Sequence, residues 1–306
     1  MSRITIVGGI TADIEGNPSG QLVMGDSNPG KISIAFGGVG RNITENLARL
    51  GSSVSFVSVA GDDMTGHSAV HQLQALGVDT EGVRFLEGES TAMYLSILNL
   101  FGEMELALCN MDILERVTRE QMEALLPKLK ESEIVGLDTN LTEEVLDYVT
   151  SQLDGIPLFL DPVSVAKAVR AKNLIGRFHT IKPNRAEAEA LSGRTILNEE
   201  ELAEAGRWFG DQGVKRIFIT LSGGGVYYKE GDREGILRPG RVSPVSVTGA
   251  GDAFSAAVLD GYLRGMDVEE TARYGMSAAS CAMESRTAVN PSISHEEVKR
   301  RMSHDQ

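Results

Sequence analysis

Short apolar runs and helix-forming runs alternate along most of this chain, and this alternation constrains its fold more than any other feature. The strand-like runs are Ile4–Val7, Val54–Val59, Glu133–Leu137, Leu158–Leu160, Thr180–Ile181 and Arg216–Thr220. Helical runs with glycine stops or acidic starts accompany them: Asn42–Leu50, Thr65–Leu76, a run that opens at Thr142, Asn184–Leu191 and Asn198–Phe209. The alternation predicts an α/β fold with a doubly wound, mostly parallel sheet flanked by helices. Right-handed crossovers then bring the carboxyl ends of the strands to one edge, where ligands bind.

Charge and cysteine content narrow the range of partners. The chain of 306 residues has a formal net charge of −14, which leaves no basic surplus to neutralise nucleic-acid phosphates or an anionic membrane. Its two cysteines, Cys109 and Cys281, lie far apart without the spacing of a metal site, as in proteins of a reducing compartment. The sequence contains no signal peptide and no transmembrane run. We therefore expect a cytoplasmic protein with no nucleic-acid or membrane partner.

The stretch Val247–Phe254, with the sequence VTGAGDAF, says most about chemistry. A glycine turn that opens a helix leaves backbone N–H groups without intrahelical partners, and with the helix dipole these groups make an anion site. Asp252 places a carboxylate inside this turn. A general base beside an anion cradle suits phosphoryl transfer to an alcohol. The alternative is an ordinary helix start, in which the glycines let the chain turn and Asp252 complements the helix dipole.

A second glycine cluster, Phe36–Asn42 with the sequence FGGVGRN, also leads from a strand into a helix. Its glycines allow a small ligand to approach the backbone, and the Asn42 amide suits paired sugar hydroxyls, although many strand-to-helix turns look similar. The turn at Gly8 and Gly9 lacks the dinucleotide-binding fingerprint. The chain also lacks a Walker phosphate loop and the loop set of protein kinases.

Two further strand ends carry polar groups suited to a nucleotide. Asn184 stands at a helix start and Glu187 lies three residues on, the spacing of a capping box. The same pair alternatively places an amide and a carboxylate on the water shell of a metal ion beside nucleotide phosphates. The stretch Thr220–Gly225, TLSGGG, suits hydrogen bonds to a phosphate or a ribose, or else forms a hairpin turn into Val226–Lys229.

Two segments break the alternation, because no helix separates their strand-like runs. Gly20–Phe36 and Val83–Cys109 contain the runs Leu22–Met24, Ile32–Ala35, Met93–Leu98 and Glu105–Cys109. We expect a single domain over residues 1–306, in which segments at about 14–36 and 83–110 form hairpins added to one edge of the main sheet. They form either a small lid, which would keep water from a phosphoryl-transfer site, or ordinary edge hairpins.

The four motifs, in this order and spacing, resemble those of the ribokinase-like (PfkB) carbohydrate and nucleoside kinases, and the resemblance spans nearly the whole chain. It implies the ribokinase-like fold, ATP and Mg²⁺ as cofactors, and Asp252 as the catalytic base on a substrate 5′-hydroxyl. The anion hole is implied at Gly249, Ala250 and Gly251. The other implied positions are Asn184 and Glu187 for Mg²⁺ (through water) and the ATP phosphates, Thr220, Ser222, Gly223, Gly225 and Asn290 for the nucleotide, and Asp13, Gly38, Asn42 and Asp138 for the ribose hydroxyls.

Finer features resemble the members of this family that act on a uracil nucleoside. They lie in Ser27–Gly30, beside Asn42, and in Leu137–Leu141, Asp161–Lys167 and His179–Arg185. Side chains that could meet the carbonyl and N–H groups of a uracil ring are those of Asn28, Arg41, Asn140 and Lys167. Each could equally be a turn residue, a surface charge or a helix-start residue.

Two departures from the family pattern bear on ions and substrate. Ser246 stands where many members have an aspartate that helps to bind an activating potassium ion, so potassium activation is not assumed. Thr11 stands where ribokinases often have asparagine, which disfavours free ribose as the acceptor.

We expect a small-molecule nucleoside substrate and a homodimer formed through the lid strands. Two alternatives are a kinase of this family for another nucleoside, a sugar or a sugar phosphate, and a non-catalytic nucleoside-binding protein of the same fold.

Overall fold

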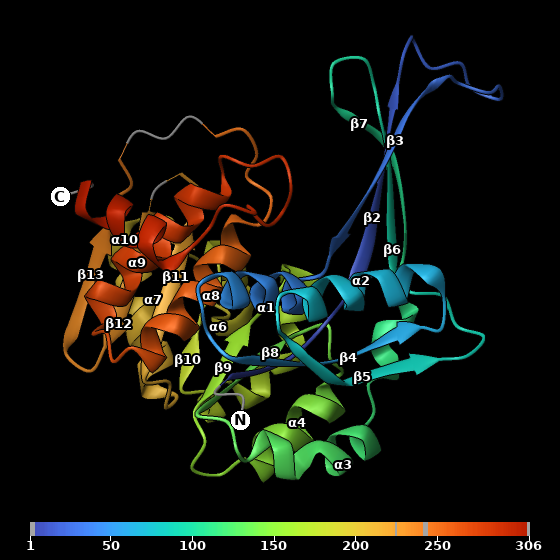
Figure 1. Ribbon diagram of the computed structural model, residues 1–306. Helices are drawn as coiled ribbons and strands as arrows, with labels where there is room; N and C mark the ends of the chain where they lie inside the picture. Colours follow the sequence, from blue (N-terminus) through green and yellow to red (C-terminus); the bar gives the residue numbers. More distant parts are fainter. Residues whose placement is uncertain (1–3, 224, 241–243, 305–306) are drawn as a thin grey trace.

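A nine-stranded sheet forms the centre of the computed structural model, which describes residues 4–223, 225–240 and 244–304 (Figure 1). Across the sheet the strands are β13 (Arg233–Leu237), β12 (Gly225–Glu230), β11 (Arg216–Leu221), β10 (Thr180–Ile181), β9 (Leu158–Asp161), β8 (Ile134–Asp138), β1 (Ile4–Val7), β4 (Val54–Gly61) and β5 (Asp79–Leu86). Only the pairs β11–β12 and β12–β13 are antiparallel among these neighbours. The predicted α/β fold with a mostly parallel sheet is confirmed.

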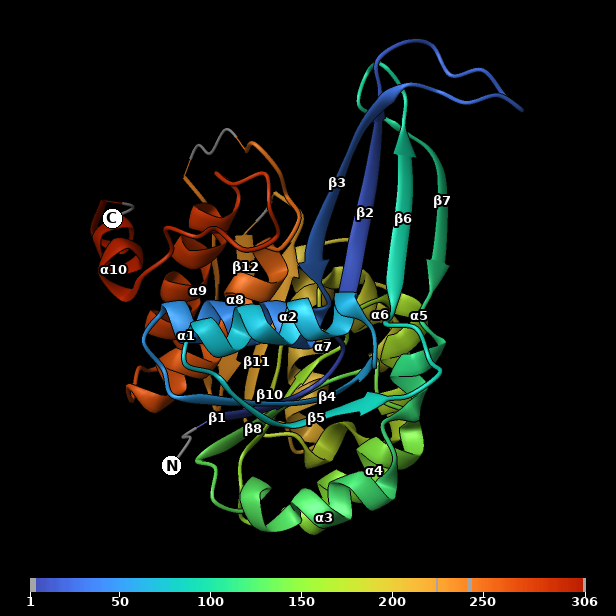
Figure 2. The ribbon, with the colours of Figure 1, turned by 45° about the vertical axis from the view of Figure 1, so that its right-hand side comes forward.

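Helices cover both faces of this sheet, and an apolar core lies under each layer (Figures 1 and 2). One face carries α1 (Val39–Arg49), α2 (Met64–Ala75), α8 (Ala250–Leu263), α9 (Val268–Ala282) and α10 (His295–His304). The other carries η1 (Asp112–Arg116), α3 (Arg119–Leu129), α4 (Glu143–Gln152), α5 (Val165–Ala168), η2 (Val169–Arg177), α6 (Arg185–Ser192) and α7 (Glu199–Asp211). None of the helices that the structure describes is long and apolar enough to cross a membrane.

Side-chain caps fix several helix starts. Thr142, Asn184 and Asn198 each accept a hydrogen bond from a backbone N–H in the first turn, which explains why these starts could be predicted. Helix α1 begins at Val39 rather than at the predicted Asn42, because Gly38 adopts φ +95° and lets the chain enter the helix earlier. Helix α3 was not predicted, and Pro127 lies inside it.

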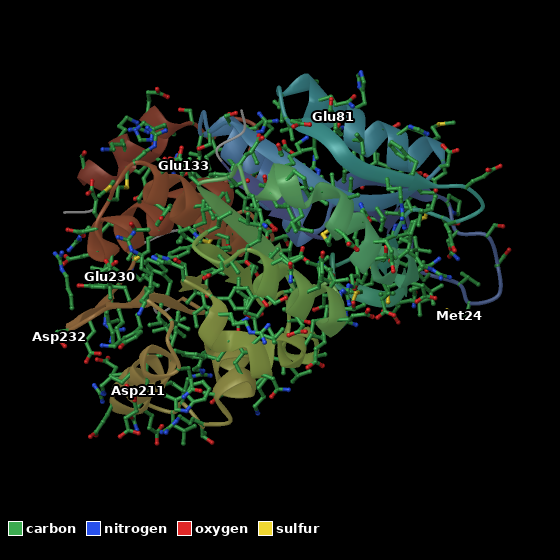
Figure 3. All side chains as sticks on the ribbon, turned by 90° about the horizontal axis from the view of Figure 1, so that it is seen from below. Met24, Glu81, Glu133, Asp211, Glu230 and Asp232 are labelled. Atoms are coloured by element: carbon green, nitrogen blue, oxygen red, sulfur yellow. The ribbon has the colours of Figure 1, made fainter. Side chains whose placement is uncertain are left out.

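A second sheet of four strands stands away from the main body (Figures 1 and 2). Its strand order is β3 (Gly30–Gly37), β2 (Thr11–Pro18), β6 (Met93–Leu98) and β7 (Met104–Asn110). The two expected hairpins are confirmed as β2–β3 and β6–β7, but their expected place on one edge of the main sheet is wrong, because they form a sheet of their own. The run Leu22–Met24 is not a strand, and β3 pairs with β2. Because β2 also pairs with β6, it connects the hairpin of the first segment to the hairpin of the second. The loop between β2 and β3 carries Met24 to the opposite end of the molecule from Asp211 and Asp232 (Figure 3).

The two faces of the second sheet differ in chemistry. Register places Ile34, Ile14, Leu95 and Leu108 in one cross-strand row and Ile32, Gly16, Ile97 and Leu106 in the next, so that one face is apolar. Ile32 is 76% exposed and Leu108 63% exposed. On the other face, a row of Ala35, Asp13, Tyr94 and Cys109 turns toward α1 and α5, where Asp13 interacts with the charge of Arg41 and Cys109 with that of Lys167.

Candidate active site

The glycine turn before α8 leaves the helix start open. Gly249 is the residue before the first helical position, with φ +79°, and no side chain caps the helix there. A Cβ on Gly249 would lie 1.8 Å from the carbonyl oxygen of Ala288, so this close approach requires glycine. Gly249 itself offers no capping side chain, and the Ala250 N–H lies 3.4 Å from the Val247 carbonyl oxygen, so the first turn of α8 is arranged as helix starts that accept an anion are.

Asp252 lies in the first turn of α8 and contacts α1. Its Oδ2 accepts a hydrogen bond of 2.8 Å from Nδ2 of Asn42, a residue 210 positions away in sequence. Burial and the neighbouring carboxylates of Asp161 and Asp138 raise the pKa of Asp252 to about 7, against the opposing effects of Asn42 and Lys182. A carboxylate with a pKa near neutrality is suited to accept a proton during catalysis.

Arg41 orients the Asn42 amide by a hydrogen bond to its oxygen atom. Its Oδ1 accepts a hydrogen bond of 3.1 Å from Arg41 Nη1, which leaves Nδ2 to face Asp252. Arg41 is buried and also contacts Glu45 and Gln72. Burial lowers the pKa of Arg41, and Glu45 opposes this effect.

Two charged residues that sequence reasoning did not select meet beneath the α8 turn. Nζ of Lys182 lies 2.9 Å from Oδ2 of Asp161, and both side chains are buried. Ser255 on α8 donates a hydrogen bond of 2.7 Å to the same carboxylate oxygen. Asp161 ends β9 and Lys182 directly follows β10, its parallel neighbour, so the expected edge of carboxyl strand ends was the available signal.

Asp138, at the end of β8, binds the backbone N–H groups of the glycine turn that begins α1. Its Oδ2 accepts hydrogen bonds of 2.9 Å from the backbone N–H groups of both Gly9 and Gly40, and another from Asn140. Its Oδ1 accepts from the backbone of Asn140. The carboxylate thus ties the turn after β1 to the start of α1.

Asn184 and Glu187 form the predicted capping box at the start of α6. Glu187 Oε2 accepts 2.8 Å from the Asn184 N–H, and Asn184 Oδ1 accepts 3.0 Å from the Glu187 N–H. Burial raises the pKa of Glu187. The described residues contain no group of three or more His, Cys, Asp or Glu side chains that could hold a metal ion. One carboxylate without a full protein cage fits Mg²⁺, which commonly keeps its waters and binds through one or two carboxylates and phosphates.

The turn from Thr220 to Gly225 lies beside Asn184. Thr220 and Asn184 pair as an isolated parallel bridge, which extends the main sheet by one contact. The turn then leads into the antiparallel β12, as in the hairpin alternative. Ser222 and Gly223 are exposed, and Gly225 has φ +100° with no room for a side chain next to the Leu237 carbonyl. Gly224 lies outside the described residues.

The remaining sequence-predicted residues fall into two groups. Lys167 donates a hydrogen bond of 2.5 Å to Oδ1 of Asn140, which places both next to Asp138. Asn28 instead bonds to the backbone of Val23 and Asp26 within the exposed loop between β2 and β3. The structure does not bring Asn28 to the other predicted residues within this chain.

Asn290 and Ser246 are engaged in local hydrogen bonds near the α8 turn. The buried Asn290 amide donates to the carbonyl oxygen of Cys281 at 2.7 Å and accepts from the N–H of Ser292. Ser246 Oγ accepts 3.1 Å from the Thr248 N–H. Because Ala288 contacts Gly249, the loop that contains Asn290 lies against the glycine turn.

Comparison with known proteins gives consistent matches over the chain. Residues 1–295 match the pfkB family of carbohydrate kinases. A pseudouridine kinase of Escherichia coli (strain K12) is 35% identical, with 95% of this chain and 93% of that protein covered. An uncharacterized sugar kinase of the same organism, YeiI, is 34% identical over 94% of this chain and 80% of its own length. A carbohydrate kinase structure from Agrobacterium tumefaciens matches with a TM-score of 0.87 at 28% identity, covering 99% of this chain and 97% of that one.

Proposed function

Because the chain belongs to the pfkB family of carbohydrate kinases, we propose that it transfers the γ-phosphoryl group of ATP to the 5′-hydroxyl of pseudouridine. A kinase that acts on a sugar or a nucleoside follows from family membership and similarity to known members. The observation that carries the chemistry is the Asp252 carboxylate, whose pKa lies at about 7 beside the open start of α8. Similarity to the E. coli pseudouridine kinase supports the substrate.

In this proposal Asp252 accepts the proton of the substrate hydroxyl as the oxygen attacks the phosphorus atom. The Asn42 amide holds the carboxylate in place, since its Nδ2 donates to Oδ2. The backbone N–H groups at Gly249, Ala250 and Gly251 stabilise the negative charge of the transferred group, as donors fixed before the reaction do. Positioned bases contribute about 10²–10⁴-fold to rate, so Asp252 is the residue on which turnover depends most.

We propose ATP and Mg²⁺ as cofactors on the α6 and β11 side of the site. Bound Mg²⁺ would neutralise phosphate charge and ATP would supply the phosphoryl group. Asn184 and Glu187 would hold the metal through water, because the capping box already fixes both side chains. The residues proposed to border the nucleotide are Thr220, Ser222, Gly223, Gly225 and Asn290.

The nucleoside is proposed to lie between α1 and the inner face of the second sheet. Asp13 is half-buried on that face, and burial raises the pKa of its carboxyl. Asp13, Gly38 and Asn42 would hold ribose hydroxyls, while Asp138 would shape the pocket by fixing Gly9 and Gly40. Asn140 and Lys167 supply acceptor and donor groups for a uracil ring, and Arg41 acts by orienting Asn42.

A homodimer through the second sheet accompanies this proposal. The outward face of that sheet exposes a patch of Ile32, Ile34, Leu106 and Leu108, and exposed apolar patches rimmed by polar residues mark interfaces. Pairing two copies face to face would remove this area from water. Light scattering that finds a monomer at micromolar concentration would contradict the dimer.

The test of the function is ADP release from ATP and Mg²⁺ with separate acceptors. Pseudouridine, uridine, ribose and fructose 6-phosphate are each supplied to the purified chain. We expect strong turnover with pseudouridine and little with uridine. Turnover with only one of the other acceptors would support the kinase chemistry and reject pseudouridine as the substrate. If that acceptor were fructose 6-phosphate, Lys167 would be suited to bind its phosphate group. Tight binding of a nucleoside without ADP release would favour the non-catalytic alternative.

A further inference from the structure

We propose that Lys182 is a positioning residue that keeps the Asp252 carboxylate ionised and holds the glycine turn of α8 in place. This inference rests on the proposed kinase function, in which Asp252 is the base. The lysine is 6% exposed, and Nζ contacts both Asp161 Oδ2 at 2.9 Å and the carbonyl oxygen of Gly251 at 3.5 Å. It therefore links the end of β9 to the turn that carries Asp252.

The partner of Lys182 is itself held on three sides. Asp161 Oδ2 accepts from Ser255 Oγ at 2.7 Å, and Oδ1 accepts from the Val163 N–H at 3.0 Å. Val163 is the only non-glycine residue with positive φ, +62°, in the described ranges 4–223, 225–240 and 244–304. A β-branched residue in this region is strained, and such strain persists only where the surroundings impose it. The Asp161 carboxylate, and with it Lys182, is thus fixed in position.

Charge balance explains why the base needs this cation. Asp161 and Asp138 face Asp252 from the ends of β9 and β8 and raise its pKa, whereas Lys182 and Asn42 lower it. Lys182 in turn faces the carboxylates of Asp161, Glu187 and Asp252. Without its ammonium group, each of these carboxylates would oppose ionisation of the others. The base would then be protonated at neutral pH and unable to accept the hydroxyl proton.

The pH profile of turnover tests this role. We expect Lys182→Met to shift the acid limb upward by about one pH unit, to lower kcat/KM at pH 7 by about 5-fold as a result, and to recover activity toward pH 9. Lys182→Arg keeps the charge and is expected to keep the limb near its original position. Lys172→Met, at an exposed lysine outside the site, is the matched control. An acid limb in Lys182→Met identical to that of the parent chain would overturn the proposal.

A second measurement does not depend on turnover. The difference in urea stability between the parent chain and Asp252→Asn, followed against pH, reports the pKa of Asp252 in the folded state. The same difference between Lys182→Met and Lys182→Met/Asp252→Asn is expected to titrate at higher pH. If Lys182→Met does not fold, Asp161→Asn is added to every member of the comparison to restore charge balance. A parent chain that turns over no acceptor rejects the proposed function, whereas an unmoved stability midpoint rejects the role of Lys182.

Discussion

The glycine turns that begin α1 and α8 share a sequence pattern, but only one of them binds a carboxylate of this chain. At α1, Asp138 accepts hydrogen bonds from the N–H groups of Gly9 and Gly40. At α8, the N–H of Ala250 instead bonds to a backbone oxygen, that of Val247, and Gly249 has no side chain to cap the helix. The comparison shows that the same kind of helix start either holds the fold together, where a carboxylate of the chain accepts its N–H groups, or keeps N–H groups available to an anionic ligand, which is the role proposed for the start of α8.

Replacement of the proposed base Asp252, in the glycine turn that begins α8, has the largest expected effect. We expect Asp252→Asn to lower turnover about 10²–10⁴-fold, because a positioned base is lost while its shape is kept. ADP release measures this, with Asp154→Asn at an exposed position as the control. Equal turnover in Asp252→Asn and the control would remove the functional distinction between the two turns.

The next largest effect is expected when a side chain is added to Gly249, before the first turn of α8. Gly249→Ala combines left-handed strain with a Cβ 1.8 Å from the Ala288 carbonyl oxygen, for an expected loss of about 2–4 kcal/mol in stability. Gly51→Ala is the matched control, because Gly51 has φ +89° and an added Cβ meets nothing within 4 Å. Urea denaturation of both variants separates strain from the clash. Equal losses would show that the approach of Ala288 is unimportant.

At the start of α1, where Asp138 accepts the backbone N–H groups, a substitution is expected to lower stability rather than to slow the chemical step. Asp138→Asn places an amide donor where the carboxylate accepts backbone hydrogens, and we expect a loss of about 2 kcal/mol. Asp147→Asn, which loses only an exposed ion pair with Arg177, should cost less than about 1 kcal/mol. If Asp138→Asn lowers kcat as much as Asp252→Asn without loss of stability, the glycine turn that begins α1 also takes part in catalysis.

Asp252 is also expected to make the stability of the folded chain depend on pH. Its pKa is about 7 in the folded chain against an ordinary value of 3.8, so the folded state binds the proton more tightly. The stability of the parent chain therefore falls as pH rises from about 4 to 7, and Asp252→Asn avoids this loss. We expect the variant to be more stable than the parent chain at pH 8 and indistinguishable from it at pH 4. Urea midpoints at both values measure it, and the reverse order would contradict the raised pKa.

Local signals account for the parts of the fold that the sequence predicts well. Caps at Thr142, Asn184 and Asn198 act within one helical turn, so the residues that cause them are visible in the sequence. Strand β2 was missed because Gly16 and Pro18 interrupt its pattern and one of its two partners, β6, lies far away in sequence at Met93–Leu98. Pairing between distant strands is a tertiary effect that local propensity does not report.

For the site, motifs predict the glycine turns and Asp252 but not the ion pair beneath them. Asp161 and Lys182 each appear in the sequence as a single charge after a strand, which is typical of a solvated residue. Their contact depends on β9 and β10 being neighbours and on α8 covering them, as Ser255 does. The roles of Asn28 and Asn290 likewise depend on partners, and their amides bond to nearby backbone groups.

The second sheet is long enough to turn a small rotation at its base into a larger displacement at its far end. Its strands β2 and β3 are eight residues long, which at about 3.3 Å per residue gives an arm of roughly 26 Å from a base formed by Thr11 and Gly37. A tilt of about 10° at that base would sweep the far end through roughly 4–5 Å but displace Asp13, near the base, by only about 1 Å. An optical label on the loop that carries Met24 would therefore amplify a movement too small to follow at the substrate.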